Sequence, residues 1–184
     1  MKESADKEIL VLLKKPGRDY EEGFRLLLRA YQEKLYWHIR RMVIDHEDAN
    51  DVLQNVFLKV YRSIQQFEGK SKLYTWLYRI ATNETLTFLK QKRKRSTVSI
   101  GKDEFDLVNT LKADSFFEGS EVMYKLQQAI LQLPDKQRLV FNMRYHEEMS
   151  YREMSLILDT SVGALKASYH HAVRKIEEYI KKLV

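Results

Sequence analysis

Apolar residues recur at three- and four-residue spacings along most of this chain, which is the pattern of helices that bury one face. Few residues interrupt this pattern, because only six Gly and two Pro occur among the 184 residues. All-β folds need turn residues at short intervals, so the pattern predicts an all-α fold. Charged residues make up 32% of the chain and no long apolar run occurs, which argues against membrane insertion.

The helical pattern stops at Ser96 and resumes near Glu121. Two lysines and six acidic residues give this stretch a net charge of −4, whereas the whole chain carries +6. A structureless stretch of this length inside one compact domain would be unusual. The sequence therefore predicts two small helical domains, residues 1–95 and 121–184, joined by an acidic flexible linker over residues 96–120. The basic remainder of the chain favours a polyanion as partner.

The residues that usually carry chemistry are absent or badly spaced. The chain contains no Cys, which excludes disulfides and thiolate-bound zinc and fits a reducing, cytoplasmic compartment. The string His146-Glu147-Glu148 lacks the second His of a zinc-protease helix, and His170-His171 project about 100° apart on a helix. We therefore expect a solvated or capping role for these side chains, with no metal, no cofactor and no enzymatic activity.

Four helices are expected in the first domain. The first ends at Pro16-Gly17, because proline interrupts a helix, and the second starts near Tyr20. The third opens at Asp48, which we expect to be its N-cap. A break at residues 67–71 precedes the fourth helix, which ends in the basic run Lys90–Arg95.

Two surfaces of this domain are candidate binding sites. The third helix has a polar side on which a leucine lies among acids and amides, as in a small protein-docking patch: Asp48, Asp51, Gln54, Asn55 and Leu58. The fourth helix combines aromatic residues with cations, which stacking on an unpaired base and binding its phosphates require. Its candidates are Tyr74, Trp76, Arg79, Asn83, Lys90 and Arg93, with Phe67 across the break. The alternative for Trp76 is packing in the core.

Four helices are also expected in the second domain. Ser150 and Glu153 have the spacing of a capping box that opens a short helix. A turn at residues 159–161 precedes a longer last helix, and this order is that of a DNA-binding helix-turn-helix. The start and outer face of the last helix carry small and basic residues suited to phosphates and base edges: Ser161, Gly163, Lys166, Ala167, Ser168, His170, His171 and Arg174. The alternative is the solvated face of an αα-hairpin.

Several strings along nearly the whole chain resemble the extracytoplasmic-function (ECF) group of bacterial sigma factors. In the first domain they are DANDVLQNVF over residues 48–57, FEGKS over 67–71 and YTWLYRIATN over 74–83. In the second domain they are Leu133-Pro134, MSYREM over 149–154 and SVGALK over 161–166. Their order and spacing together are highly specific. The string KASYHHA over 166–172 resembles the Bacteroidetes branch of the group.

The resemblance implies an alternative sigma factor that recruits core RNA polymerase to specific promoters and helps to melt the minus-ten element. It implies docking on the clamp helices of the β′ subunit through Asp48, Asp51, Gln54, Asn55 and Leu58. A pocket for a flipped non-template base and its phosphates is implied at Phe67, Gly69, Lys70, Ser71, Tyr74, Trp76, Arg79, Asn83, Lys90 and Arg93. The second domain is implied to bind the β flap and to place its last helix in the major groove of the minus-thirty-five element.

The family also implies partners and specific departures. The implied partners are core polymerase, promoter DNA and an anti-sigma factor, with the chain a monomer when free of them. Asn55 stands where the family commonly has Glu. Ser168 and Val173 stand where many members have Arg in the last helix, and the absence of these two arginines changes the minus-thirty-five sequence that we expect to be read. Leu77 occupies the position of a second melting Trp in housekeeping sigma factors, so we infer weaker strand separation.

Two other functions stay open on the residues alone. One is a free-standing helix-turn-helix regulator that binds duplex DNA without polymerase. The other is an adaptor that works only through protein contacts.

Overall fold

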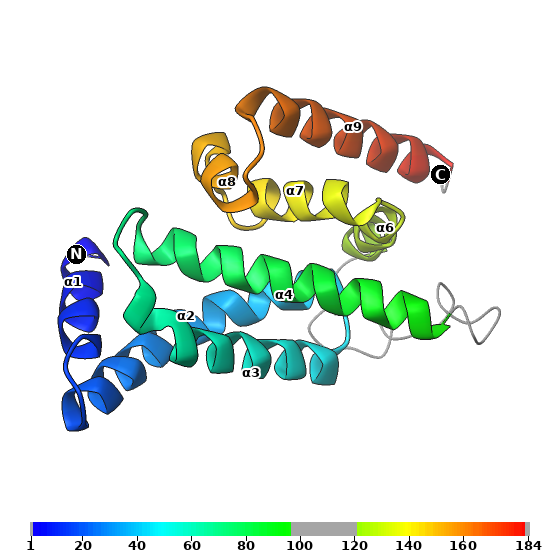
Figure 1. The fold of residues 1–184 in the computed structure, drawn as a ribbon. Helices are drawn as coiled ribbons and strands as arrows, with labels where there is room; N and C mark the ends of the chain where they lie inside the picture. The colour runs from blue at the N-terminus through cyan, green and yellow to red at the C-terminus, as the bar shows by residue number, and fades with distance from the viewer. Residues whose placement is uncertain (1, 97–120, 183–184) are drawn as a thin grey trace.

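The computed structural model describes residues 2–96 and 121–182, and every regular element in these ranges is helical (Figure 1). The first range forms α1 (Lys2–Leu13), α2 (Arg18–Val43), α3 (His46–Ser63), the short 3-10 helix η1 (Ile64–Gln66) and α4 (Leu73–Ser96). The second forms α6 (Glu121–Leu131), α7 (Asp135–Tyr145), α8 (Tyr151–Leu158) and α9 (Val162–Lys181). The predicted all-α fold is confirmed. Apart from Ser96, the predicted linker lies outside the described residues.

A tight hairpin joins α1 to α2. Pro16 stops α1, and Gly17 turns the chain with a φ of 75°, a conformation that costs glycine little. The two helices then approach closely at Gly23, where an added Cβ would lie 2.8 Å from the Cβ of Leu12. Further along α2, the Tyr31 hydroxyl donates a hydrogen bond to the Asp6 carboxylate of α1 at 2.7 Å, which is a second contact between the two helices.

The third helix begins earlier than its sequence suggested. Its N-cap is Asp45, whose carboxylate accepts a hydrogen bond from the amide of Asp48 at 2.9 Å. The prediction that Asp48 is the N-cap is therefore wrong; Asp48 occupies the first turn, where a carboxylate also favours a helix start. The buried face of α3 is Ala49, Val52, Leu53, Val56 and Val60.

The predicted helix-turn-helix is present in α8 and α9. The Ser150 hydroxyl accepts from the Glu153 amide at 3.2 Å, and the Glu153 carboxylate accepts from the Ser150 amide at 2.8 Å, so the capping box is confirmed. Asp159 ends α8 in a left-handed conformation with a φ of 50°. The Ser161 hydroxyl then accepts from the Ala164 amide and caps α9.

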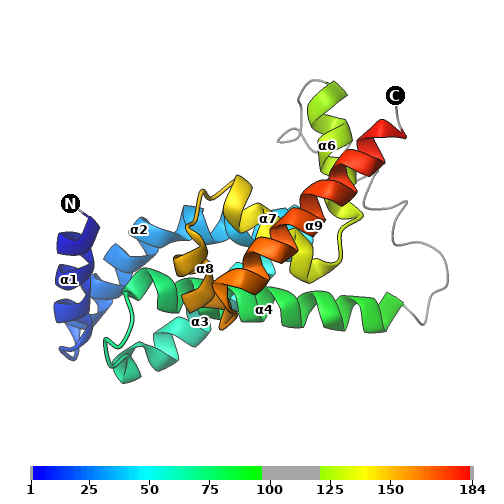
Figure 2. The ribbon, with the colours of Figure 1, turned by 90° about the horizontal axis from the view of Figure 1, so that it is seen from above.

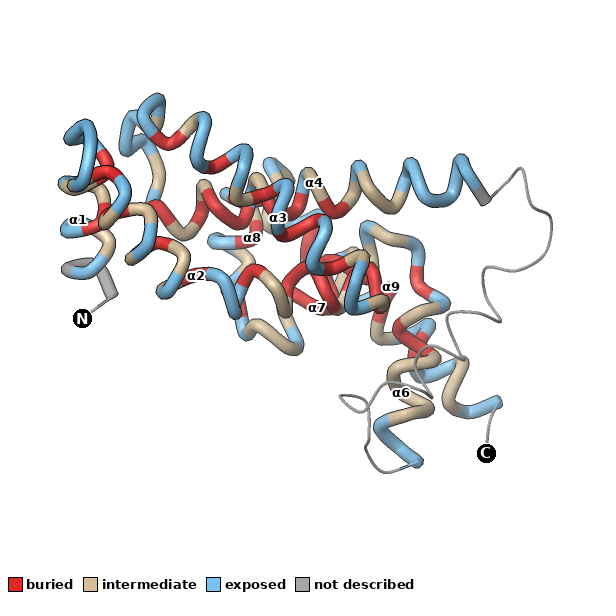
Figure 3. The backbone as a smooth tube through the Cα atoms, turned by 90° about the horizontal axis from the view of Figure 1, so that it is seen from below, coloured by how far each residue is buried: buried red, intermediate tan, exposed pale blue. Residues whose placement is uncertain are grey.

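The two parts of the chain pack against each other. Helices α7 and α8 lie on α2 and α4 (Figures 1 and 2). One apolar cluster joins α1–α4 to residues of the second part: Leu139, Val140, Met143, Met149, Met154, Ile157 and Leu165. A second cluster lies between α6, α7 and α9. Buried residues gather where these helices meet, whereas the last turns of α4 are exposed (Figure 3).

Within the described residues, no helix has both the length and the apolar character needed to cross a lipid bilayer.

Candidate nucleic-acid interface

An open groove of about 550 Å³ runs between α2 and α3. Its walls are mainly apolar, and the ring of Phe24 lies edge-on to those of Phe57 and Tyr61, with centroids 6.5 and 5.0 Å away. Tyr61 is 48% exposed and borders this groove. Apolar surface left open to solvent beside polar residues is typical of a docking site.

The side chains predicted to dock on another protein lie along α3, next to this groove. Four of them are exposed to solvent: Asp51, Gln54, Asn55 and Leu58. Of these, Gln54 and Leu58 line the groove. Asp48 differs, because its half-buried carboxylate lies 2.6 Å from the Lys92 ammonium group of α4. Asp48 therefore joins α3 to α4.

The break before α4 carries an aromatic pair. Phe67 packs on Trp76 with ring centroids 5.4 Å apart, and both rings are half-buried. Trp76 thus packs against the core and keeps part of its surface in solvent. Gly69 has a φ of 73°, and an added Cβ would meet no atom within 4 Å, so the backbone conformation rather than crowding favours glycine there. Lys70 is exposed and pairs with Glu68, while Ser71 is half-buried.

The polar candidates on α4 fall into two groups. Asn83 and Lys90 are exposed to solvent. Arg79 and Arg93 contact the second part of the chain: Arg79 donates to the main-chain carbonyl of Leu156, and Arg93 pairs with Asp135, whose carboxylate raises the pKa of Arg93. Two cations predicted to bind phosphates are therefore engaged by α7 and α8.

Tyr74 is half-buried in the first turn of α4. Its ring packs on that of Tyr78 with centroids 4.3 Å apart. Burial raises the pKa of both hydroxyls well above their usual range, with the nearby Glu147 carboxylate adding to the effect. Both hydroxyls are therefore neutral at physiological pH.

The predicted reading face of α9 points to solvent. Leu165, Ala172 and Ile176 form its buried side. The exposed residues are Gly163, Lys166, Ala167, His170, His171 and Arg174, whereas Ser168 is half-buried. Lys166 lies 6.0 Å from the ring centroid of Tyr151, and Arg174 pairs with Glu178 at 3.7 Å. The exposed cations can reach an approaching polyanion.

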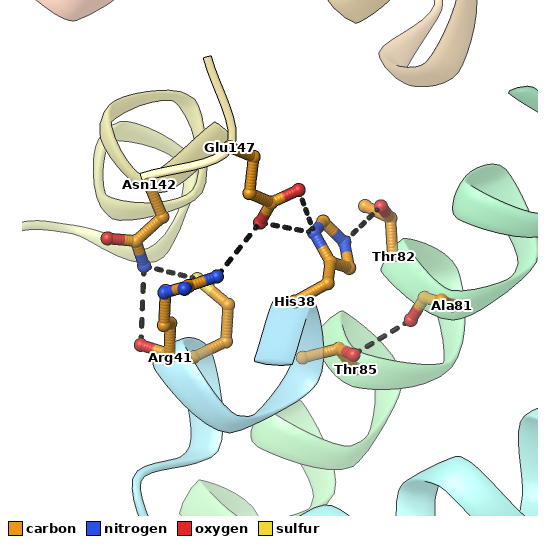
Figure 4. A network of polar contacts seen from close by, with 8 residues as sticks. His38, Arg41, Ala81, Thr82, Thr85, Asn142 and Glu147 are labelled. Atoms are coloured by element: carbon orange, nitrogen blue, oxygen red, sulfur yellow. Dashed lines mark hydrogen bonds and ion pairs between the residues drawn. The ribbon is translucent and has the colours of Figure 1, made fainter. Parts of the chain in front are cut away.

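A buried polar network between the two parts of the chain escaped the sequence analysis (Figure 4). The Glu147 carboxylate lies 3.0 Å from Nδ1 of His38 and 3.9 Å from the guanidinium of Arg41. Nε2 of His38 lies 2.9 Å from the Thr82 hydroxyl. The solvated or capping role predicted for Glu147 is wrong, since its side chain is only 8% exposed.

The neighbouring His146 also lies in a desolvated setting. Burial lowers its pKa to about 4, and the nearby Arg41 charge acts in the same direction. Among the described residues, no three His, Cys, Asp or Glu side chains are placed to hold a metal ion.

Comparison with known proteins identifies both parts of the chain. Residues 27–95 match the family profile for sigma-70 region 2, and residues 123–176 match that for sigma-70 region 4. The chain is 30% identical to the ECF RNA polymerase sigma-E factor of Escherichia coli K12, over 95% of each chain. The chain belongs to the ECF sigma factors. This sigma factor is also 30% identical to RNA polymerase sigma-H factor of Pseudomonas aeruginosa, over 94% of each chain. It is 28% identical to the ECF sigma factor SigW of Bacillus subtilis, over 93% of this chain and 96% of that one.

Solved structures share the fold of this sigma factor. CnrH, solved in complex with the cytosolic domain of CnrY, has a TM-score of 0.70 at 17% identity, covering 97% of this chain and 98% of that one. The sigma factor RpoE of Bartonella quintana, solved with the anti-sigma factor NepR, has a TM-score of 0.61 at 22% identity, covering 90% of this chain and 98% of that one.

Proposed function

We propose that this ECF sigma factor directs core RNA polymerase to specific promoters and helps to melt the minus-ten element. The observation that carries the proposal is the presence of both sigma-70 regions on one chain, each with an exposed candidate face. A free-standing helix-turn-helix regulator would use only the second region and would leave the groove beside α3 without a role.

The groove and the polar side of α3 form the surface for the clamp helices of the polymerase β′ subunit. Apolar walls supply area, while Asp51, Gln54 and Asn55 at the edge supply polar contacts that fix the register. Asp48 supports this surface through its ion pair with Lys92. The second domain binds the β flap.

The turn before α4 receives a base flipped out of the non-template strand of the minus-ten element. Unpairing a base costs a few kcal/mol, which stacking and hydrogen bonds must offset. The partly exposed pair of Phe67 and Trp76 supports such stacking, and Asn83 offers an exposed amide. The same site includes Gly69, Lys70, Ser71, Tyr74, Arg79, Lys90 and Arg93.

Helix α9 reads the minus-thirty-five element in the major groove. Gly163 and Ala167 keep the helix surface small, so that the backbone can approach the bases. Lys166 and Arg174 can bind phosphates, and Ser168 with His170 and His171 can contact base edges. Ser161 holds the start of the helix as its cap.

The two domains, residues 1–95 and 121–184, act together through the linker over residues 96–120. Two modest DNA contacts mounted on one polymerase gain avidity, so neither domain needs tight binding alone.

The cellular setting follows from this function. The protein works in the cytoplasm, by binding and without covalent chemistry, and is a monomer when free of partners. Both solved neighbours are complexes, CnrH with the cytosolic domain of CnrY and RpoE with the anti-sigma factor NepR, which supports an anti-sigma partner here. The string over residues 166–172 supports an origin in the Bacteroidetes branch.

Binding to core polymerase tests the docking surface. Asp51→Ala combined with Gln54→Ala should weaken binding of core RNA polymerase by about tenfold or more, because polar contacts at a docked interface are lost. Glu21→Ala combined with Gln65→Ala removes an acid and an amide from exposed sites outside the groove and is the control. Unchanged affinity in the first variant would contradict the proposed surface.

A further inference from the structure

The groove between α2 and α3 continues into a second hollow of about 380 Å³, toward the turn that joins the two helices. Four lining residues belong to both hollows: Leu28, Gln32, Asn50 and Leu53. On α2 the lining runs from Phe24 to Tyr36, which is about 18 Å at about 1.5 Å per residue. The Phe24 end is aromatic, whereas the polar side chains of Arg29, Glu33 and Tyr36 line the other end. The groove is therefore one continuous surface with a polar end.

His46 bridges the two helices at this polar end. It is the first residue of α3, and a tight turn through buried Ile44, which has a φ of 69°, brings it back beside α2. Its Nδ1 lies 2.6 Å from the Tyr36 hydroxyl oxygen, and its Nε2 lies 3.0 Å from the Asn50 amide nitrogen. Tyr36 and Asn50 line the groove, whereas His46 does not. The imidazole thus contacts one groove residue on each helix from outside the lining.

The partners of His46 fix which ring nitrogen carries the hydrogen. An amide nitrogen can only donate, so Nε2 accepts from Asn50 and, in the neutral ring, Nδ1 carries the hydrogen. Nδ1 then donates to the Tyr36 oxygen, and the Tyr36 hydroxyl keeps its own hydrogen for another acceptor. The Asn50 amide, held by its nitrogen, keeps its oxygen for another donor. One chain of hydrogen bonds therefore presents a donor and an acceptor at the polar end of the groove.

This orientation matters because the side chains are accessible. His46 and Asn50 are exposed and Tyr36 is half-buried, so without these bonds their polar groups could adopt several orientations. Ordering a side chain on binding costs about 0.5–1.5 kcal/mol. Groups that are already oriented in the free chain avoid part of this cost when a partner covers them.

We propose that His46 is a positioning residue for polymerase binding, which orients the Tyr36 hydroxyl and the Asn50 amide toward the partner in the groove. The inference rests on the proposed function, which assigns the groove to the clamp helices of the β′ subunit. It adds the α2 wall and the polar end of the groove to that surface. The polymerase segment that lies there offers an acceptor to Tyr36 and a donor to Asn50.

NMR spectroscopy of the free chain tests the hydrogen-bond chain itself. Long-range proton–nitrogen spectra at about pH 8, where histidines are neutral, should show the Nδ1–H form for His46. The resonances of His46 are assigned by their loss in His46→Ala. Asn50→Asp should move the hydrogen to Nε2, because a carboxylate can only accept. An Nε2–H ring in the unsubstituted chain would overturn the inference.

Titrations with core RNA polymerase test the role of this chain of bonds. His46→Ala should raise the dissociation constant by about 2- to 5-fold, the effect of one neutral hydrogen bond, and Tyr36→Phe should do the same. In a chain that already carries Tyr36→Phe and Asn50→Ala, His46→Ala should have no further effect, because His46 acts through these two side chains. Lys34→Ala is the control, since Lys34 is exposed on α2 and does not line the groove.

The outcomes separate this inference from the proposed function. Equal affinity of His46→Ala and the unsubstituted chain for core polymerase would overturn the inference and leave the proposed function standing. A further loss from His46→Ala in the chain that lacks the Tyr36 hydroxyl and the Asn50 amide would reveal a merely structural role and would also overturn it. A chain that shows the Nδ1–H ring yet does not bind core polymerase would contradict the proposed function, and with it the polymerase as occupant of the groove.

Discussion

Leu58 offers an energetic probe of the groove between α2 and α3. It is 49% exposed, so about half of its surface remains to be buried by a partner. Burying a whole leucine side chain is worth about 1.5–3 kcal/mol, so the remaining half is worth about 0.7–1.5 kcal/mol. Leu58→Ala should remove most of this contribution and weaken binding of core RNA polymerase by about 3- to 10-fold.

The assay is a fluorescence anisotropy titration of the labelled full chain with core polymerase at fixed salt. Val11→Ala is the control, because Val11 is 57% exposed on α1 and does not line the groove. The midpoint of thermal unfolding should change little in either variant, since both side chains lie at the surface. A dissociation constant for Leu58→Ala within twofold of the unsubstituted value, or an equal loss in Val11→Ala, would refute the reasoning.

Three further predictions concern DNA melting, helix capping and pH. Asn83→Ala should slow open-complex formation, measured by permanganate reactivity, more than recruitment to duplex promoter DNA; equal loss in both assays would place the pocket elsewhere. Ser150→Ala should lower the free energy of unfolding by about 1 kcal/mol in urea titrations because α8 loses its N-cap, whereas Ser155→Ala inside the helix should not. His146 has its pKa lowered from 6.5 to about 4, so the unfolded chain binds a proton first as pH falls. The contribution of His146 to the free energy of unfolding should therefore be full above pH 6.5 and should fall by about 1–2 kcal/mol toward pH 4, since this group is partly exposed. In urea titrations, His146→Gln should flatten this decline, whereas His171→Gln should not.

The sequence predicts the elements of this fold well where the signals are local. The hairpin at Pro16-Gly17, the capping box at Ser150 and Glu153, and the turn before α9 each depend on residues within a few positions of one another. Short-range signals still leave ambiguity: Asp45 and Asp48 both suit a helix start, and the carboxylate of Asp45 makes the cap.

The contact between the two domains could not be predicted in this way. His38 and Glu147 are 109 positions apart, and neither has a neighbour in sequence that indicates the other. Glu147 follows a histidine in a polar turn, a pattern typical of solvated residues, yet packing buries it. The same long-range packing engages Arg79 and Arg93, for which the combination of cations and aromatic residues on one helix suggested DNA.

Transcription with purified core RNA polymerase tests the central claim most directly. The full chain, mixed with core enzyme and a pool of random promoter sequences, should produce transcripts that start at defined sites and share two upstream sequence elements. Transcripts that start no more specifically than with core enzyme alone, from a chain that binds duplex DNA tightly without polymerase, would contradict the account.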